Sequence, residues 1–173
     1  MPTEKDFKHI IDEYNGILYK IARSYTLGEA DFKDLYQEML IQLWKSYGRF
    51  RGESKISTWI YRVVLNTALT FQKKQKRQQS NNPINIISFK IPDQSRVGVE
   101  QVIQKEEKIE LLYKCINQLG KDERAIILLH LDEKKYDEIA EILGLTTNHV
   151  GVKLLRIKKQ LFKLLNEQGY GRI

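Results

Sequence analysis

Apolar residues recur every three to four positions along five segments of the 173-residue chain. This period matches the α-helix and gives each segment one apolar face. We found no convincing segment with the period of two that is typical of strands. The five segments are 7–25, 32–47, 56–71, 109–119 and 125–165. We therefore predict an all-α fold made of two small helical domains that an extended linker joins.

The helical period lapses between residues 78 and 104. Proline disfavours the helical conformation in the residue before it, and Pro83 and Pro92 follow Asn and Ile in this segment. The sequence therefore predicts domains at 1–77 and 105–168, a linker at 78–104 and a short tail at 169–173. Part of the linker is apolar enough to pack on a surface, through Ile86, Ile87, Phe89 and Ile91.

The chain carries 29 Lys and Arg against 22 Asp and Glu, which gives a net charge of +7. Such a balance suits a polyanionic partner but is weak support for nucleic acid on its own. A single cysteine, Cys115, excludes an internal disulfide, and its helical apolar neighbours indicate a buried structural thiol. There is no signal-peptide pattern after Met1 and no long apolar run. We therefore expect a cytoplasmic protein without membrane insertion.

The segment from Ser57 to Arg77 forms a helix with two contrasting faces at about 100° per residue. Cations neutralise phosphates, amides and guanidinium groups bond base edges, and an aromatic ring stacks on an unpaired base, so the front face suits DNA. The alternative is a packed tryptophan followed by a solvated basic tail. The apolar back carries Ile60, Val64, Thr67, Ala68 and Phe71, and the front carries Trp59, Arg62, Asn66, Thr70, Lys73 and Arg77.

The segment 47–57 precedes this helix and breaks the period with Gly48 and Gly52. We expect a polar loop there, with Ser57 or Thr58 as the N-cap of the helix. A loop beside a basic and aromatic helix face is a place where an extruded base can be held.

The helix around residues 30–47 carries an acidic stripe opposite its apolar side. Asp34 and Glu38 form a like-charge pair at i and i+4, which costs a few tenths of a kcal/mol in an isolated helix. The stripe indicates either a basic protein partner or an ordinary solvated face. Its members are Asp31, Asp34, Glu38 and Gln42; the apolar side carries Phe32, Leu35, Tyr36, Met39, Leu43 and Trp44.

The stretch YDEIAEILGLTTNHVGVKLLRIKKQL reads as two helices around a turn at Gly144. The first helix spans 136–143, and Thr146 or Thr147 opens the second. Apolar residues of both helices face each other across the turn, which predicts a helix-turn-helix whose second helix enters the major groove of DNA. The outward side chains of that helix are Asn148, Val152, Leu155, Arg156 and Lys159.

Three stretches together resemble the extracytoplasmic-function (ECF) class of bacterial sigma factors: DLYQEMLIQLW, FRGESKISTWIYRVVLN and the helix-turn-helix segment. They stand in the order and at the separation of that family and cover nearly the whole chain. The resemblance implies an alternative sigma factor that binds core RNA polymerase and directs promoter-specific initiation. It implies melting of the minus-10 element by the first domain and recognition of the minus-35 duplex by the second. Core polymerase, promoter DNA and an anti-sigma factor are the implied partners.

The resemblance also assigns a role to individual residues. It places Asp34, Gln37 and Glu38 against the clamp helices of the largest polymerase subunit. The loop and helix of 52–77 align with the part that holds an extruded base. Its minus-10 set is Ser54, Lys55, Trp59, Arg62, Asn66, Thr70, Lys73 and Arg77. The minus-35 set is Thr147, Asn148, His149, Val152, Lys153, Leu155, Arg156 and Lys159.

The sequence departs from the family after the turn, where relatives often have Thr-Val-Lys-Ser-Arg and this chain has His149-Val150-Gly151-Val152-Lys153. Val152 can meet a thymine methyl group and Asn148 an adenine, so we expect a minus-35 element rich in A and T. Glycine costs up to about 1 kcal/mol inside a helix, a penalty consistent with a close approach of the backbone to DNA at Gly151.

Two other classes of protein compete with this interpretation. A helix-turn-helix repressor or a response-regulator output domain explains the second domain and leaves the first without a role. A DNA enzyme needs a nucleophile with a base, or paired metal ligands, and no such set occurs at a recognisable spacing. The sequence also lacks a nucleotide-binding glycine motif and a zinc-spaced His and Cys set. We therefore expect no catalytic activity, no cofactor and no metal.

Overall fold

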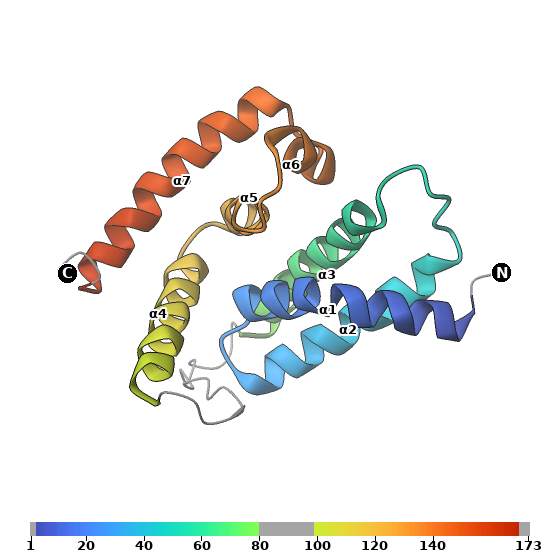
Figure 1. Ribbon diagram of the computed structural model, residues 1–173, viewed down its shortest axis with the longest axis horizontal. Coiled ribbons are helices and arrows are strands. Elements are labelled where there is room, and N and C mark those ends of the chain that lie inside the picture. Colours follow the sequence, from blue (N-terminus) through green and yellow to red (C-terminus); the bar gives the residue numbers. More distant parts are fainter. Residues whose placement is uncertain (1–2, 80–98, 170–173) are drawn as a thin grey trace.

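The computed structural model describes residues 3–79 and 99–169 and confirms the all-α fold (Figure 1). Within these ranges the chain forms helices and connecting turns, without strands. The helices are α1 (Glu4–Tyr25), α2 (Glu29–Tyr47), α3 (Ile56–Gln79), α4 (Val99–Asn117), α5 (Lys121–Leu131), α6 (Tyr136–Leu143) and α7 (Thr147–Glu167).

Helices α1, α2 and α3 pack against one another as the first helical unit. Thr3 caps α1, because its hydroxyl accepts a hydrogen bond from the Asp6 backbone at 3.2 Å and the Asp6 carboxylate accepts one from the Thr3 backbone at 3.0 Å. The core of this unit is fully buried. It includes Leu18, Ile21, Leu35, Met39, Leu43, Ile60, Val64 and Ala68.

Helices α4 to α7 form the second unit, in which α7 packs along α4, α5 and α6. Cys115 is buried in α4, as predicted, and burial raises the pKa of its thiol. The core of this unit includes Ile116, Ile126, Leu129, Ile139, Val150, Leu154 and Ile157.

The two units touch each other: α3 lies against α6, and α1 lies against α4 and α5. Tyr25 at the end of α1 donates a hydrogen bond from its hydroxyl to the carbonyl of Lys121 at 2.8 Å. The Arg124 guanidinium lies 5.3 Å from the centre of the Tyr25 ring and donates to the carbonyl of Ser24 at 3.4 Å. These contacts fix the start of α5 against the end of α1.

Helix α3 begins two residues earlier than an N-cap at Ser57 requires and three earlier than one at Thr58. Ile56 is its first residue, and the Trp59 amide donates to the Lys55 carbonyl at 3.1 Å. Ser57 and Thr58 therefore lie inside the first turn, and their prediction as the N-cap is wrong. Helix α3 also extends to Gln79 and α4 begins at Val99, so both enter the segment predicted as linker. The apolar linker residues 86–91 lie outside the described ranges.

Burial departs from the apolar pattern at three aromatic or aliphatic positions. Trp44 is 49% exposed, so its prediction on the core side of α2 is wrong. Tyr61 and Leu65 are buried although the face analysis of α3 did not place them in the core. The reason is that α3 is covered on two sides, by α1 and α2 within its own unit and by α6 of the other.

Candidate nucleic-acid and polymerase interfaces

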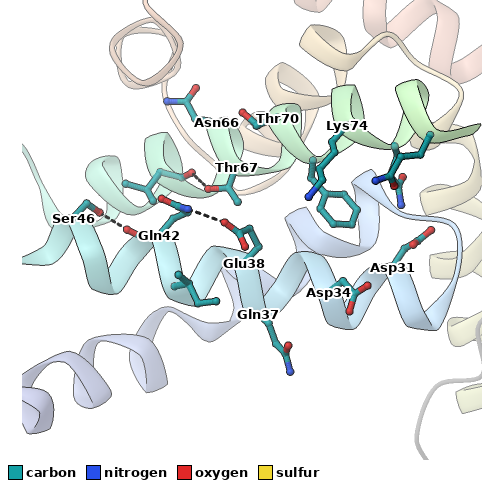
Figure 2. A pocket seen from close by; sticks show the side chains of 15 residues that line it. Asp31, Asp34, Gln37, Glu38, Gln42, Ser46, Asn66, Thr67, Thr70 and Lys74 are labelled. Atoms are coloured by element: carbon teal, nitrogen blue, oxygen red, sulfur yellow. Dashed lines mark hydrogen bonds between the residues drawn. The ribbon is translucent and has the colours of Figure 1, made fainter.

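A groove of about 900 Å³ runs between α2 and α3 and joins two of the predicted sites (Figure 2). The α2 wall carries the whole predicted polymerase-binding set, Asp34, Gln37 and Glu38. The α3 wall carries Asn66 and Thr70 of the predicted minus-10 set. The sequence placed these two sets on separate helices, and the fold makes them opposite walls of one depression.

The α2 wall presents its polar side chains unequally. Asp34 and Gln37 are exposed, whereas Glu38 is half-buried. The Gln42 side chain donates a hydrogen bond to the Glu38 carboxylate at 2.7 Å, which holds that carboxylate along the helix. Asp31 also lines the groove. This wall is therefore an acidic surface, exposed at Asp34 and half-buried at Asp31 and Glu38, whose charge complements a basic protein surface.

The front of α3 is exposed at five of its six predicted positions. Asn66 and Thr70 line the groove, and the remaining exposed positions are Arg62, Lys73 and Arg77. An amide, a hydroxyl and three cations thus follow one face of the helix. This face can bond base edges and phosphates together.

Trp59 is the exception on the front of α3, because it is half-buried. Its ring lies 5.1 Å from that of Phe50 and 6.1 Å from that of Tyr47, measured between ring centres. These contacts tie the loop before α3 to the end of α2 and support the packing alternative for this tryptophan. Its contact with DNA stays a prediction.

The loop before α3 and the first turns of α3 are bonded to α6. The Lys55 ammonium lies 3.1 Å from the Glu138 carboxylate, and Arg62 donates to the Glu141 carbonyl at 2.8 Å. The Lys135 backbone amide and Lys55 lower the pKa of Glu138. Ser54 of the same loop is half-buried. Two of the predicted minus-10 cations are therefore engaged by the second helical unit.

The helix-turn-helix forms as the sequence predicts. Gly144 ends α6 in the left-handed conformation at φ 67°, and the Leu145 amide donates to the Ala140 carbonyl at 2.9 Å. Thr146 is the N-cap of α7, and its hydroxyl accepts a hydrogen bond from the His149 amide at 3.2 Å. These two local signals fix the angle at which α7 leaves the turn.

Helix α7 buries one stripe and exposes the opposite one. Of the predicted minus-35 set, Lys153 is half-buried and the other seven members are exposed. Two of those seven are apolar: Val152 is 46% exposed and Leu155 is 61% exposed. The buried stripe consists of Val150, Leu154, Ile157 and Leu161.

Gly151 faces α6 and not the outer surface of α7. A Cβ atom at this position would lie 3.6 Å from a ring carbon of Tyr136, which is an ordinary van der Waals distance. The space at Gly151 therefore does not require glycine. This geometry gives no support to a close approach of DNA as the reason for the residue.

The described residues include no group of three or more His, Cys, Asp or Glu side chains that could hold a metal ion. Nor does any helix in residues 3–79 and 99–169 have the length and apolar character needed to cross a membrane.

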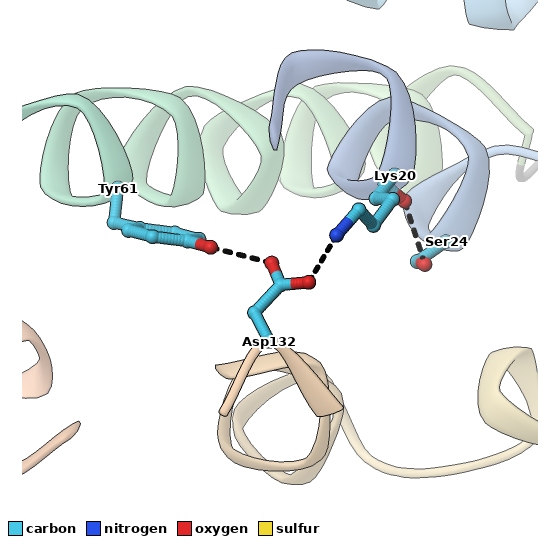
Figure 3. A network of polar contacts seen from close by, with 4 residues as sticks. All are labelled: Lys20, Ser24, Tyr61 and Asp132. Carbon is cyan, nitrogen blue, oxygen red and sulfur yellow. Dashed lines mark hydrogen bonds and ion pairs between the residues drawn. The ribbon is translucent and has the colours of Figure 1, made fainter. Parts of the chain in front are cut away.

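Sequence analysis did not single out Tyr61, Lys20 or Asp132, which meet between the two units (Figure 3). The Asp132 carboxylate accepts hydrogen bonds from the Tyr61 hydroxyl and the Lys20 ammonium. No local pattern signals this meeting, because 71 residues separate Tyr61 from Asp132 in the chain.

Two family models match the chain within its two helical units. Residues 10–78 match Sigma-70 region 2, and residues 109–161 match Sigma-70, region 4. The chain is 26% identical over 164 residues to the ECF RNA polymerase sigma-E factor of Escherichia coli strain K12, covering 91% of this chain and 85% of that relative. It is 27% identical over 169 residues to the ECF RNA polymerase sigma factor SigX of Bacillus subtilis strain 168, covering 92% and 87%.

Two solved structures share the fold. The sigma factor RpoE, in complex with the anti-sigma factor NepR from Bartonella quintana, matches with a TM-score of 0.73 at 22% identity, covering 94% of this chain and 98% of that one. CnrH, in complex with the cytosolic domain of CnrY, matches with a TM-score of 0.67 at 19% identity, covering 95% and 90%. The region 2 match accounts for the first unit, which a simple repressor leaves without a role. The chain therefore belongs to the ECF class of sigma factors, the alternative sigma factors that direct transcription initiation with RNA polymerase.

Proposed function

We propose that this sigma factor binds core polymerase through α2 and promoter DNA through α3 and α7. The observation that carries the proposal is the groove between α2 and α3, whose walls hold the predicted polymerase contacts and part of the predicted minus-10 contacts. Polymerase bound on one wall brings single-stranded promoter DNA to the other. The proposed first domain covers residues 1–77 and the second 105–168, and α3 and α4 both extend into the linker 78–104 that joins them.

The polymerase contact consists of Asp34, Gln37 and Glu38, which meet basic residues of the clamp helices. Asp34 contributes most, because it is exposed, while Glu38 is already bonded by Gln42 at 2.7 Å. Truncation of a well-placed interface carboxylate costs about 1–3 kcal/mol of binding free energy, roughly a five- to 150-fold loss of affinity.

The minus-10 contact follows the front of α3. Asn66 bonds the edge of an unpaired base, and Thr70, Lys73 and Arg77 follow the phosphate backbone beyond it. Lys55 and Arg62 also contact the DNA once their bonds to Glu138 and Glu141 are broken. Trp59 and Ser54 support the loop that leads into the helix.

The minus-35 contact is the outer face of α7 in the major groove. Arg156 and Lys159 supply charge, Asn148 bonds an adenine, and the exposed Val152 contacts thymine methyl groups. We therefore expect an A/T-rich minus-35 element. Selection of duplexes from a random pool by the full-length protein tests this, and a G/C-rich consensus would contradict it.

An anti-sigma factor is the third partner that we propose. Support comes from two proteins of the same fold, RpoE and CnrH, whose structures were solved in complexes with the anti-sigma factor NepR and the cytosolic domain of CnrY. The polymerase carries out the chemistry of transcription, so this chain itself acts without a catalytic residue or cofactor.

Co-purification with tagged bacterial core polymerase tests the central contact. We expect the wild-type chain to be retained, Asp34→Ala to bind more weakly than Glu38→Ala, and the double variant to be lost. The matched control is Asp12→Ala with Glu13→Ala, which removes two exposed carboxylates from α1. Equal retention of the Asp34 and Glu38 double variant and the wild type would overturn the assignment of α2.

A further inference from the structure

One carboxylate joins three helices across the boundary between the two units (Figure 3). Asp132 directly follows α5, and its side chain is 14% exposed. It accepts hydrogen bonds from Lys20 of α1 and Tyr61 of α3. A mostly buried charge is costly unless it is paired and hydrogen-bonded, and both conditions hold only while the two units are together.

The Tyr61 hydroxyl is also well suited to donate a hydrogen bond to Asp132. Tyr61 is 2% exposed, and burial together with Asp132 raises the pKa of its hydroxyl, which therefore stays protonated as a donor. The Lys134 ammonium lies 5.6 Å from the centre of the Tyr61 ring. Both faces of the boundary thus contribute groups that separation would leave without their partners.

The same boundary covers part of the proposed DNA surface. Arg62 is the neighbour of Tyr61 in α3 and donates to the Glu141 carbonyl at 2.8 Å. Lys55 pairs with Glu138 one turn earlier on α6, at 3.1 Å. Two cations that we propose contact the minus-10 element are thus bonded to residues of α6 instead.

A promoter requires a different arrangement of the two units. Elements centred near minus 10 and minus 35 lie about 25 base pairs apart, roughly 80 Å along the duplex at about 3.4 Å per base pair. Here α3 lies directly against α6, the helix that precedes the recognition helix α7. The two DNA-reading elements cannot reach both sites while this contact lasts.

We propose that the described structure is a closed form that cannot engage a promoter, held shut by Asp132 through Tyr61 and Lys20. The inference rests on the proposed role of Arg62 and Lys55 at the minus-10 element. Asp34 and Gln37 of α2 remain exposed in the closed form. Core polymerase can therefore dock first, and the separation of the units that follows frees the front of α3.

Asp132 contributes more to this closure than the two ion pairs made with α6, because those pairs are more exposed. Side chains of Lys55 and Arg62 are 75% and 42% exposed, and such surface ion pairs contribute little. Loss of one net hydrogen bond to a charged group shifts a two-state equilibrium on the order of tenfold. A single substitution at Asp132 is thus expected to change the population of the open form measurably.

The test compares Asp132→Ala and Tyr61→Phe with the wild type in the full-length protein. Tyr61→Phe keeps the buried ring and removes only the hydroxyl. The matched control is Asp137→Ala, which removes an exposed carboxylate from α6. Small-angle X-ray scattering of the free protein should give a larger radius of gyration for both boundary variants and an unchanged one for the control. Circular dichroism melts verify that each variant is folded.

The second readout is affinity for a short fluorescein-labelled oligothymidylate at low salt, without polymerase. We expect Asp132→Ala to bind on the order of tenfold more tightly than the wild type, because more of the protein is competent to bind. Adding Arg62→Ala to Asp132→Ala should remove most of that gain. An unchanged radius of gyration, or an unchanged affinity in both boundary variants, overturns the proposal.

Opening of the two units and binding of polymerase give separate readouts in the Asp132→Ala variant. Small-angle scattering reports the opening, and retention of Asp132→Ala by tagged core polymerase, beside the wild type, reports the binding. If that variant binds polymerase like the wild type but is no more open, the proposed role of Asp132 is wrong and the proposed polymerase contact stands. If the variant opens but polymerase retains neither it nor the wild type, the proposed role of Asp132 stands and the assignment of α2 to polymerase binding fails.

Discussion

Helices α3 and α7 both carry a stripe that we propose contacts DNA, yet the two stripes differ in how far the rest of the protein covers them. The outer face of α7 is exposed along its predicted contact set, apart from the half-buried Lys153. The front of α3 is bonded to α6 at Arg62, and the loop before it is bonded at Lys55. The proposed minus-35 surface is therefore exposed in this structure, while the proposed minus-10 surface is partly bonded to α6.

The chemistry of the two stripes differs as well. The front of α3 is polar, with an amide, a hydroxyl and cations beside a groove. The outer face of α7 includes the exposed apolar residues Val152 and Leu155 between its polar ones. Polar groups beside a groove suit extruded bases and phosphates, whereas apolar groups on a helix suit the methyl groups of the major groove. This contrast supports our proposal that α3 contacts single-stranded DNA and α7 contacts duplex DNA.

The largest effect is expected at Trp59, which is half-buried while the other predicted contacts on the front of α3 are exposed. Trp59→Ala should lower the free energy of unfolding by about 2–3 kcal/mol, because the ring packs on Phe50 and Tyr47 while staying half-exposed. Thermal and denaturant melts measure this. The control is Trp44→Ala, which removes the 49% exposed tryptophan. A stable Trp59→Ala protein with defective promoter opening would instead make Trp59 a dedicated DNA contact.

The next largest effects are expected when one amide is removed from each stripe, Asn66 on α3 or Asn148 on α7. Asn66→Ala should reduce promoter opening about tenfold to hundredfold and spare duplex binding, since a good base-edge contact contributes about 1–3 kcal/mol. Asn148→Ala should do the reverse. Opening is followed by the fluorescence of a base analogue in the minus-10 element, and duplex binding by anisotropy. Asn166→Ala, an exposed amide near the end of α7, is the control. Equal defects of Asn66→Ala and Asn148→Ala in both assays would erase the distinction between the stripes.

A smaller effect is expected from the phosphate contacts. Lys73→Ala and Lys159→Ala should each weaken binding to all promoters alike and reduce the slope of affinity against salt by about one, because each contact releases about one counterion. Titration of promoter binding at several salt concentrations measures the slope. Lys33→Ala serves as the control, since Lys33 pairs with Glu29 on α2 at 2.7 Å. A change in promoter preference would show that these lysines read bases.

The smallest effect is expected at Gly151. Gly151→Ala should raise the free energy of unfolding by up to about 1 kcal/mol, because alanine favours the helix and its Cβ meets Tyr136 at an ordinary distance. Duplex affinity should stay unchanged. Melts and anisotropy on the same preparation measure both quantities. A stabilised protein with tenfold weaker duplex binding would mean that DNA approaches the α7 backbone closely at Gly151.

Local patterns were sufficient to predict most of the fold. The helical period predicted the helices, and Gly144 predicted the helix-turn-helix; of the two predicted N-caps, Thr146 and Thr147, the structure has Thr146. Prediction failed where tertiary contacts decide. Trp44 carries an apolar pattern yet is half-exposed, and Tyr61 is buried at the boundary with the second unit, where it contacts Asp132 and Lys134.

The candidate sites also include features that local patterns predict and features that tertiary contacts decide. Exposure of Asp34, Asn66 and the α7 face follows from helical spacing, so sequence alone could identify these surfaces. The groove that joins α2 to α3 depends on how the helices pack, and the bonds of Asp132 depend on how the units meet. Neither relation has a period or a motif, because its residues are brought together only by tertiary folding.

Run-off transcription tests most directly whether α2 brings this chain to the polymerase. Purified protein is added to bacterial core polymerase with a library of promoter fragments, and the transcripts are sequenced. We expect specific initiation from a subset of fragments, lost in the Asp34→Ala and Glu38→Ala double variant and kept in the Asp12→Ala and Glu13→Ala control. Specific initiation that the double variant retains in full would contradict this role of α2.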